Sequence, residues 1–278
     1  MALNPESVGS TTEVYEHSYT WKDTVLYALG CGATRDELEY LYEKSGPKVL
    51  PTYAVVPSFP ACMTLMNSVG GDYKGVVHGA QKITVHKPFA AEGTLRTVGK
   101  VAGIYDLKRF ASAIITSETH DESGTLIAET EWNIIFRFDG GFGGAPPPKR
   151  KRYPVPDRPA DFVVEEAIPE NQALLYRLSG DENPLHADPD LAKSVGFEAP
   201  ILHGLCTYGY IGRALIKEVC QGDGDRLVSL SGQFRKPVWP GETLVTEGWN
   251  EDEMTLVRAY TKERPGDYVV GNGYAEIK

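Results

Sequence analysis

The residue types most able to do chemistry together stand in one six-residue stretch, Asp181-Glu-Asn183-Pro-Leu-His186. Gly180 and Pro184 favour turns, so we expect these side chains on one irregular segment and not on a smooth helix. An aspartate and a histidine a few residues apart can share one water molecule, with the carboxylate as proton acceptor and the imidazole as hydrogen-bond partner or proton donor. The stretch therefore predicts a pair that activates water.

A second feature is the dipeptide His203-Gly204, which opens the longest helix that we expect in the second half of the chain, Gly204 to Val219. A glycine amide at a helix N-terminus is a ready donor to an oxyanion that develops during a reaction. A capped turn followed by the start of a helix is the alternative, purely structural interpretation of the two features.

Other chemical signatures are weak or incomplete. His203 and Cys206 are three residues apart, and His186 could join them, but without an HExxH or paired CxxC motif we expect no metal site. Gly30-Cys-Gly32 begins like a dinucleotide fingerprint, but position 35 is arginine, and no GK[ST] or GxSxG motif occurs. Nucleotide-loop and nucleophilic-serine chemistry are therefore not predicted.

The elements that must position these residues form two similar halves. Glycines and prolines crowd the segment 140–160, so we predict a linker there between an N-terminal half, 1–139, and a C-terminal half, 161–278. Shifting the chain over itself by 149 residues produces ordered identities, which indicate an internal duplication. The identities are Tyr27 and Leu29 with Tyr176 and Leu178, Pro51 with Pro200, Lys87-Pro88 with Lys236-Pro237, and Thr94-Leu95 with Thr243-Leu244.

Each half is predicted to contain helices followed by strands. In the first half, Thr34 to Glu37 has the form of a capping box for a helix that Gly46-Pro47 would stop, and a second helix is expected near 61–68. In the second half, Asp188-Pro189 is typical of the start of a short helix that ends at Gly196. The expected strands are 82–87, 94–105, 109–120, 124–138, 226–238, 242–250, 254–260 and 267–277. This order predicts an α+β fold in which a curled antiparallel sheet wraps a helix.

Length, composition and charge argue against several classes of protein. The chain has 278 residues, 41% of them hydrophobic, and its net charge of −10 repels polyanions, so we expect no nucleic-acid partner. The longest uncharged run, 49–71, contains three prolines, so no membrane span or membrane partner is predicted. The four cysteines are scattered, as expected of thiols in a reducing compartment, and no secretory signal is expected.

The stretch YRLSGDENPLHADPDLAKSVGFEAPILHG resembles the hydratase 2 motif of the MaoC-like dehydratase family, and the resemblance covers Tyr19 to Ile277. Similarity to (R)-specific 2-enoyl-CoA hydratases implies a double hot-dog fold: two halves, each a long helix wrapped by an antiparallel sheet, with the sheets side by side. It also implies that the C-terminal half is catalytic, whereas the N-terminal half has lost the pair and binds the acyl chain. The offset of 149 agrees, since Asp181 falls opposite Gly32 and His186 opposite Glu37.

The resemblance further implies the reversible hydration of trans-2-enoyl-CoA to (3R)-3-hydroxyacyl-CoA and a role for each matching residue. Asp181 and His186 would activate water, Asn183 would orient the loop and the substrate, and the Gly204 amide would hold the thioester oxygen. The residues that would contact acyl-CoA are His78, Gly79, Lys108 and Phe234. No metal and no redox cofactor is implied, since coenzyme A is part of the substrate, and a homodimer is expected.

Two rival functions stay open at the level of sequence. A 3-hydroxyacyl-ACP or 3-hydroxyacyl-CoA dehydratase of fatty-acid or polyketide synthesis would use the same residues. A non-catalytic acyl-CoA-binding module would keep the fold without the chemistry. Eukaryotic relatives often end in a peroxisomal tripeptide, whereas this sequence ends in Ala-Glu-Ile-Lys, so peroxisome and cytoplasm are both open as compartments.

Overall fold

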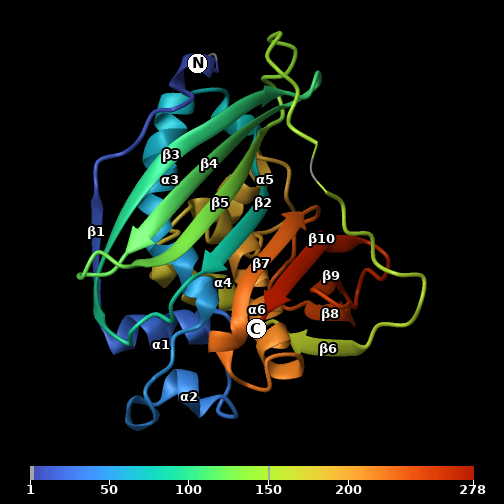
Figure 1. Ribbon diagram of the computed structural model, residues 1–278. Helices are drawn as coiled ribbons and strands as arrows, with labels where there is room; N and C mark the ends of the chain where they lie inside the picture. Colours follow the sequence, from blue (N-terminus) through green and yellow to red (C-terminus); the bar gives the residue numbers. More distant parts are fainter. Residues whose placement is uncertain (1–2, 150) are drawn as a thin grey trace.

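The computed structural model describes residues 3–149 and 151–278. Its strands are β1 (Tyr15–Tyr19), β2 (Val76–Val85), β3 (Gly93–Asp106), β4 (Ala111–His120), β5 (Leu126–Phe136), β6 (Phe162–Ala167), β7 (Leu227–Phe234), β8 (Thr243–Asn250), β9 (Thr255–Thr261) and β10 (Tyr268–Ile277). All of them join one antiparallel sheet in the order β1-β3-β4-β5-β2-β7-β10-β9-β8-β6 (Figure 1). Strands of the N-terminal half therefore form one side of the sheet and those of the C-terminal half the other.

The helices of the described chain are α1 (Trp21–Gly30), α2 (Leu38–Leu41), α3 (Val55–Val69), α4 (Gln172–Tyr176), α5 (Pro189–Ser194) and α6 (Gly204–Glu218), with single 3-10 turns between some of them. Helix α3 packs on β3 and β4, and α6 packs on β7. This is the double hot-dog architecture that the resemblance implied, and the predicted α+β class is confirmed. No helix of the described residues has the length and apolarity needed to cross a bilayer.

Helix α3 is longer than the predicted segment 61–68. Its buried side chains recur at helical spacing from Val55 to Val69, so one apolar face lies on the sheet along the whole helix. The helix ends where Gly70 adopts a φ of 72°, a conformation that glycine takes without strain. The predicted start of α6 at Gly204 is confirmed.

The two halves are related as the internal duplication predicts. Adding 149 to the bounds of α3 gives the bounds of α6. Strands β2 and β7 pair across the centre of the sheet, with Ala80 opposite Gln233 and Thr84 opposite Ser229. The offset carries each of these pairs onto the other, so the register itself has an approximate twofold axis, at the pair Lys82 and Ser231.

The helix predicted after the capping box is wrong in length. Residues Thr34 to Glu37 form a turn in which the Glu37 carboxylate accepts the Thr34 N–H, as a capping box would, but α2 spans only Leu38–Leu41. Tyr42 already has extended backbone angles, and only Tyr40 of α2 is buried, so little packing would support a longer helix. The predicted linker, 140–160, contains no helix or strand in its described residues; Arg150 lies outside them.

Candidate active site

The loop after α4 holds Asp181, Asn183 and His186 in a compact turn. Gly180 has a φ of 123° and ends the preceding 3-10 turn, which frees the chain to reverse direction. The Asn183 side chain accepts the Leu185 N–H at 3.0 Å and Pro184 follows, so the sequence Asn-Pro starts the 3-10 turn Pro184–His186. The Asp181 carboxylate accepts the Asn183 N–H at 3.3 Å. Short-range hydrogen bonds thus set the shape of this loop.

His186 and His203 lie face to face on this loop and before α6. Their ring centroids are 3.7 Å apart and the ring planes differ by 28°. His186 Nδ1 lies 2.8 Å from the carbonyl oxygen of Ile201, and His203 Nε2 lies 3.0 Å from that of Asp181. A carbonyl oxygen only accepts, so Nδ1 of His186 and Nε2 of His203 carry the protons. His186 Nε2 is therefore left as a free acceptor.

Burial shifts the proton affinity of both members of the predicted pair. It raises the pKa of Asp181, against the opposing effects of nearby His186 and of the Asn183 N–H. It lowers the pKa of His186, against the effect of the Asp181 charge. At neutral pH the loop therefore presents a neutral imidazole beside a carboxylate whose affinity for a proton is enhanced.

The N-terminus of α6 lies beside this pair in space, because His203, the residue before the helix, stacks on His186. The N–H groups of Cys206 and Thr207 bond to the carbonyl of His203, both at 3.1 Å. No described residue accepts a hydrogen bond from the Gly204 N–H. A fifteen-residue helix with a free first N–H attracts a negatively charged or polarised oxygen at this point. The structure thus leaves a free helix N–H at the residue after His203.

A wall of aromatic rings joins the Gly204 amide to the N-terminal half. The Phe234 ring lies so close to Gly204 that a Cβ there would stand 3.3 Å from it. On its other side Phe234 meets His78 at a centroid distance of 4.8 Å, and His78 stacks on Trp132 at 5.1 Å. Burial lowers the pKa of His78 to about 4, so this ring is neutral. His78, Gly204 and Phe234, three of the predicted residues, are thus brought together.

Gly79 and Lys108 have different surroundings. Gly79 occupies a bulge in β2, where a Cβ would lie 2.6 Å from Ile135 Cγ1, so a glycine fits and a larger residue would not. Lys108 is exposed in the turn between β3 and β4 and has a φ of 68°; its N–H bonds to Asp106. No contact among the described residues joins Lys108 to the rest of the site.

Asp181, His186 and His203 also resemble a metal-binding group, since one ligand atom of each lies within 4.8 Å of the others. The geometry of the rings argues against a shared ion. Two imidazoles stacked 3.7 Å apart and tilted by 28° cannot both direct an in-plane lone pair at one ion about 2 Å away. Cys206, the other residue noted at metal spacing, directs its thiol to the Gly30 carbonyl instead.

Two residues of the site, His203 and Trp132, are not predicted from the sequence to have a role in it. The only sequence signal for His203 is its position directly before the glycine that opens a helix. Nothing in the spacing of Trp132 points to His78, because their contact is made between strands β5 and β2. Both residues are recognised only from the folded chain.

The repeat counterpart of the site is filled. Gly32 stands where Asp181 stands in the other half, and the Tyr210 ring covers it so closely that a Cβ would lie 2.3 Å from that ring. Glu37 stands where His186 stands, and it is ion-paired to Arg213, which also pairs with Glu166. Arg213 is only 6% exposed. The counterpart thus holds an ion-paired carboxylate in place of the histidine, and a glycine in place of the aspartate.

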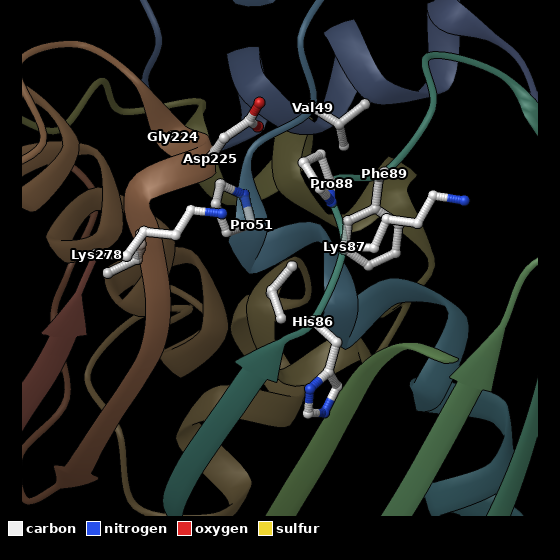
Figure 2. Close-up of a pocket in the computed structure, with 11 residues that line it drawn as sticks. Val49, Pro51, His86, Lys87, Pro88, Phe89, Gly224, Asp225 and Lys278 are labelled. Atoms are coloured by element: carbon white, nitrogen blue, oxygen red, sulfur yellow. The ribbon is translucent and has the colours of Figure 1, made fainter. Parts of the chain in front are cut away.

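A small pocket is lined by residues of both halves, among them Val49, Phe89 and Asp225 (Figure 2). Val85 and Leu227 line it, at the positions that correspond to Phe234 and His78. Lys87 and Pro88, which repeat as Lys236-Pro237, lie beside them. At the two positions that correspond to His78 and Phe234, the other side of the twofold axis therefore carries aliphatic side chains.

Comparison with known families covers both halves. A model described as "MaoC like domain" matches residues 150–271, and one described as "MFE-2 hydratase 2 N-terminal domain" matches residues 17–138. The two matches are separated by residues 139–149, most of which lie in the predicted linker.

Known proteins resemble the chain over nearly its whole length. The 3-hydroxyacyl-thioester dehydratase Y of Mycobacterium tuberculosis is 42% identical over 91% of this chain and 89% of its own length. The peroxisomal enoyl-CoA hydratase 2 of Arabidopsis thaliana is 36% identical over 94% of this chain and 91% of its own. The crystal structure of a MaoC-like dehydratase from Phytophthora capsici superposes with a TM-score of 0.90 at 31% identity, covering 99% of this chain and 98% of that one.

Proposed function

The chain belongs to the MaoC-like dehydratase family, and from this premise we propose that it is a hydro-lyase that reversibly hydrates trans-2-enoyl-CoA to (3R)-3-hydroxyacyl-CoA in fatty-acid metabolism. The observation that carries the proposal is one loop whose partly desolvated Asp181 carboxylate and free His186 Nε2 are placed, by the stack of His186 on His203, beside a helix whose first N–H is unbonded. Relatives named as enoyl-CoA hydratase 2 agree with it.

In the proposed reaction, one water molecule donates its two hydrogen bonds to the Asp181 carboxylate and to His186 Nε2. The pair takes one proton from the water as its oxygen forms a bond to Cβ of the enoyl group. The electrons of the Cα–Cβ double bond move onto the thioester carbonyl, and the pair returns the proton to Cα. Asn183 shapes the loop through its bond to the Leu185 N–H, which keeps both groups on the same side of the substrate.

The Gly204 amide stabilises the charge that develops on the thioester oxygen. A fixed donor at that oxygen favours the enolate-like transition state over the ground state, and it is most effective in a site without water. Phe234 keeps the approach to Gly204 narrow. The amide therefore supplies the electrostatic half of catalysis, and the pair supplies the proton transfers.

Acyl-CoA is expected to bind between the halves. His78 and Phe234, in contact with each other, line the path to Gly204 from the N-terminal half. Gly79 allows the bulge that turns His78 toward Phe234, and Lys108 is assigned a role only by the resemblance. We propose that the acyl chain lies against the N-terminal half, 1–139, that the C-terminal half, 161–278, is catalytic, and that neither a metal nor a redox cofactor takes part.

A dehydratase acting on other thioesters is the second candidate, since the relative with 42% identity is named 3-hydroxyacyl-thioester dehydratase Y. The same residues serve both directions of the reaction. Steady-state kinetics with a CoA substrate and with the same acyl group on a carrier protein distinguish the two. The proposal predicts the larger kcat/KM with CoA.

The test of the function is hydration of crotonyl-CoA and trans-2-decenoyl-CoA, coupled separately to dehydrogenases that accept only the (3S) or only the (3R) product. We expect turnover with the (3R) coupling alone. Formation of (3S) product, or binding without turnover at every chain length, would refute the proposal.

We also propose that the protein is a homodimer. Light scattering should then give twice the chain mass of 30.5 kDa.

A further inference from the structure

The two stacked histidines hold the site together by a reciprocal exchange. His186, on the loop, donates from Nδ1 to the carbonyl of Ile201, just before α6. His203, just before α6, donates from Nε2 back to the carbonyl of Asp181 on the loop. Both rings are buried, with 8% and 1% of their surface exposed. We call this pair of bonds, together with the ring stack, the histidine clasp.

We propose that His203 is a positioning residue for the hydration reaction: through the clasp it fixes the Asp181–His186 loop to the N-terminus of α6. The inference rests on the proposed function. The residue after His203 is Gly204, so the clasp connects the pair that activates water to the amide that would hold the thioester oxygen. Proton transfer to Cα needs both parts in one geometry, and a displacement of about 1 Å can cost about a hundredfold in rate.

The surroundings of His203 keep its ring neutral. Its Nδ1 is buried and has no hydrogen-bond partner in the described chain, so a proton there would be an unpaired buried donor. The groups around the ring are His186, the Asp181 loop, the Tyr176 ring at 4.9 Å and the charge of Arg177. Burial, with His186 and Arg177, lowers the pKa of His203 to about 3. The ring is therefore neutral at neutral pH, with its proton on Nε2.

The filled counterpart of the site lacks the clasp. Ala54 stands where His203 stands in the other half, and Glu37 stands where His186 stands. Glu37 bonds instead to Arg213. The clasp therefore occurs in the half that keeps the Asp-His pair and is absent from the half that has lost it. If the clasp served only to stabilise the fold, we would expect it in both halves.

Two substitutions separate the functions of the ring. His203→Gln keeps an N–H at the reach of Nε2 but removes the stack, and His203→Phe keeps a ring but removes the donor. We expect His203→Phe to lower kcat by about 30- to 100-fold with KM changed less than about twofold, and His203→Gln to retain kcat within about fivefold. Equal losses in the two variants, or kcat of His203→Phe within about threefold of wild type, would overturn the proposal.

The pH profile gives a readout that lost stability would not move. Without the clasp, water reaches His186, its pKa rises toward the ordinary value of 6.5, and the acid limb of kcat/KM moves to higher pH. We expect this shift in His203→Phe and not in His203→Gln. An unchanged acid limb in His203→Phe would count against the positioning role. Thermal unfolding of each variant identifies losses due to misfolding.

Nitrogen NMR of the histidine-labelled wild-type protein tests the clasp without any activity. We expect His186 with its proton on Nδ1, His203 with its proton on Nε2, and no titration of His203 between pH 5 and 8. A titrating His203, or the opposite tautomer, would overturn the inference even if no variant folds. Absence of wild-type hydration would refute the proposed function, and the inference with it, whereas these spectra bear on the clasp alone.

Discussion

The loop Gly180–His186 and its repeat counterpart, Cys31–Glu37, occupy equivalent places in the two halves and deal with buried charge in opposite ways. In the first, His186 is buried and Asp181 is half-buried, and His186 Nε2 has no hydrogen-bond partner among the described residues. In the second, the Glu37 carboxylate is bound by the Arg213 guanidinium. The first loop keeps the pKa values of Asp181 and His186 shifted, as is common for groups that transfer protons. The second loop pairs the charge of Glu37 with that of Arg213, so that this carboxylate is not left buried without a partner.

The two long helices differ in the same sense. Helix α6 begins with glycine, under an aromatic ring and behind a histidine that holds the loop. Helix α3 begins with Val55, behind Ala54, and its first residues pack into the core. The first N–H of α6 thus has no partner among the described residues, whereas the N-terminus of α3 is used for packing. A duplicated fold can therefore keep one active site per chain while the second copy becomes structural.

The largest expected effect on kcat comes from substituting one of two equivalent positions in the two halves, His186 and Glu37. His186→Gln removes the free imidazole acceptor and should lower kcat by about a thousandfold. Glu37→Gln, at the counterpart, keeps an acceptor oxygen for Arg213 and should leave kcat of the folded protein unchanged. Initial rates with trans-2-decenoyl-CoA check both. Comparable losses in the two variants would show that the halves are not divided as described.

Stability should respond to a change at the ion pairs of the counterpart site. Arg213→Met leaves the Glu37 and Glu166 carboxylates without their cation, and breaking a buried ion pair in this way costs about 3–5 kcal/mol. Urea unfolding should show this loss in the free energy of unfolding. Below the unfolding midpoint, kcat should stay within a few-fold of wild type. A variant as stable as wild type would mean that the ion pairs are not what holds the counterpart.

A smaller effect is expected where Phe234 meets Gly204. Gly204→Ala puts a Cβ 3.3 Å from the Phe234 ring, so ring and amide must separate by a few tenths of an ångström. We expect kcat to fall about three- to tenfold with little change in stability. Gly204→Ala combined with Phe234→Leu has room for the methyl group, so its kcat should exceed that of Gly204→Ala. An additive loss would contradict the steric explanation.

The smallest effect concerns Lys108, which the structure leaves apart from the site. If the exposed ammonium binds a phosphate of CoA, Lys108→Ala should raise KM for crotonyl-CoA by about two- to fivefold, as for other exposed ion pairs. Crotonyl-N-acetylcysteamine has no nucleotide, so its KM should not change. Equal KM values for wild type and variant with crotonyl-CoA would remove Lys108 from the substrate-binding residues.

Local signals in the sequence predicted much of the fold. The Asp188 carboxylate caps α5 by accepting the N–H groups of Asp190 and Leu191, as the Asp-Pro start indicates. Most strands lie where apolar alternation placed them. Strands β1 and β6 were missed because they are short edge strands of the sheet, with few buried positions to form a pattern. After β3 the offset of 149 residues no longer aligns equivalent strands of the two halves. The reason is that β3 has 14 residues, whereas its counterpart β8 has 8.

The site was predictable only where short-range contacts build it. Asp181, Asn183 and His186 share one loop whose shape follows from hydrogen bonds within a few residues. The His203 stack and the Trp132 contact join distant segments, and no spacing in the chain records such contacts. Lys108 is exposed and contacts no other described residue of the site, so its proposed role rests on the resemblance alone.

One measurement tests the central claim most directly: the rate of trans-2-decenoyl-CoA hydration, coupled to a (3R)-specific dehydrogenase, for wild type and for Asp181→Asn at equal concentrations of folded protein. Asparagine keeps the shape of the side chain and removes its ability to take a proton at neutral pH. The account predicts (3R) product from wild type and a loss of about a thousandfold or more in the variant. A variant rate within tenfold of wild type would contradict it.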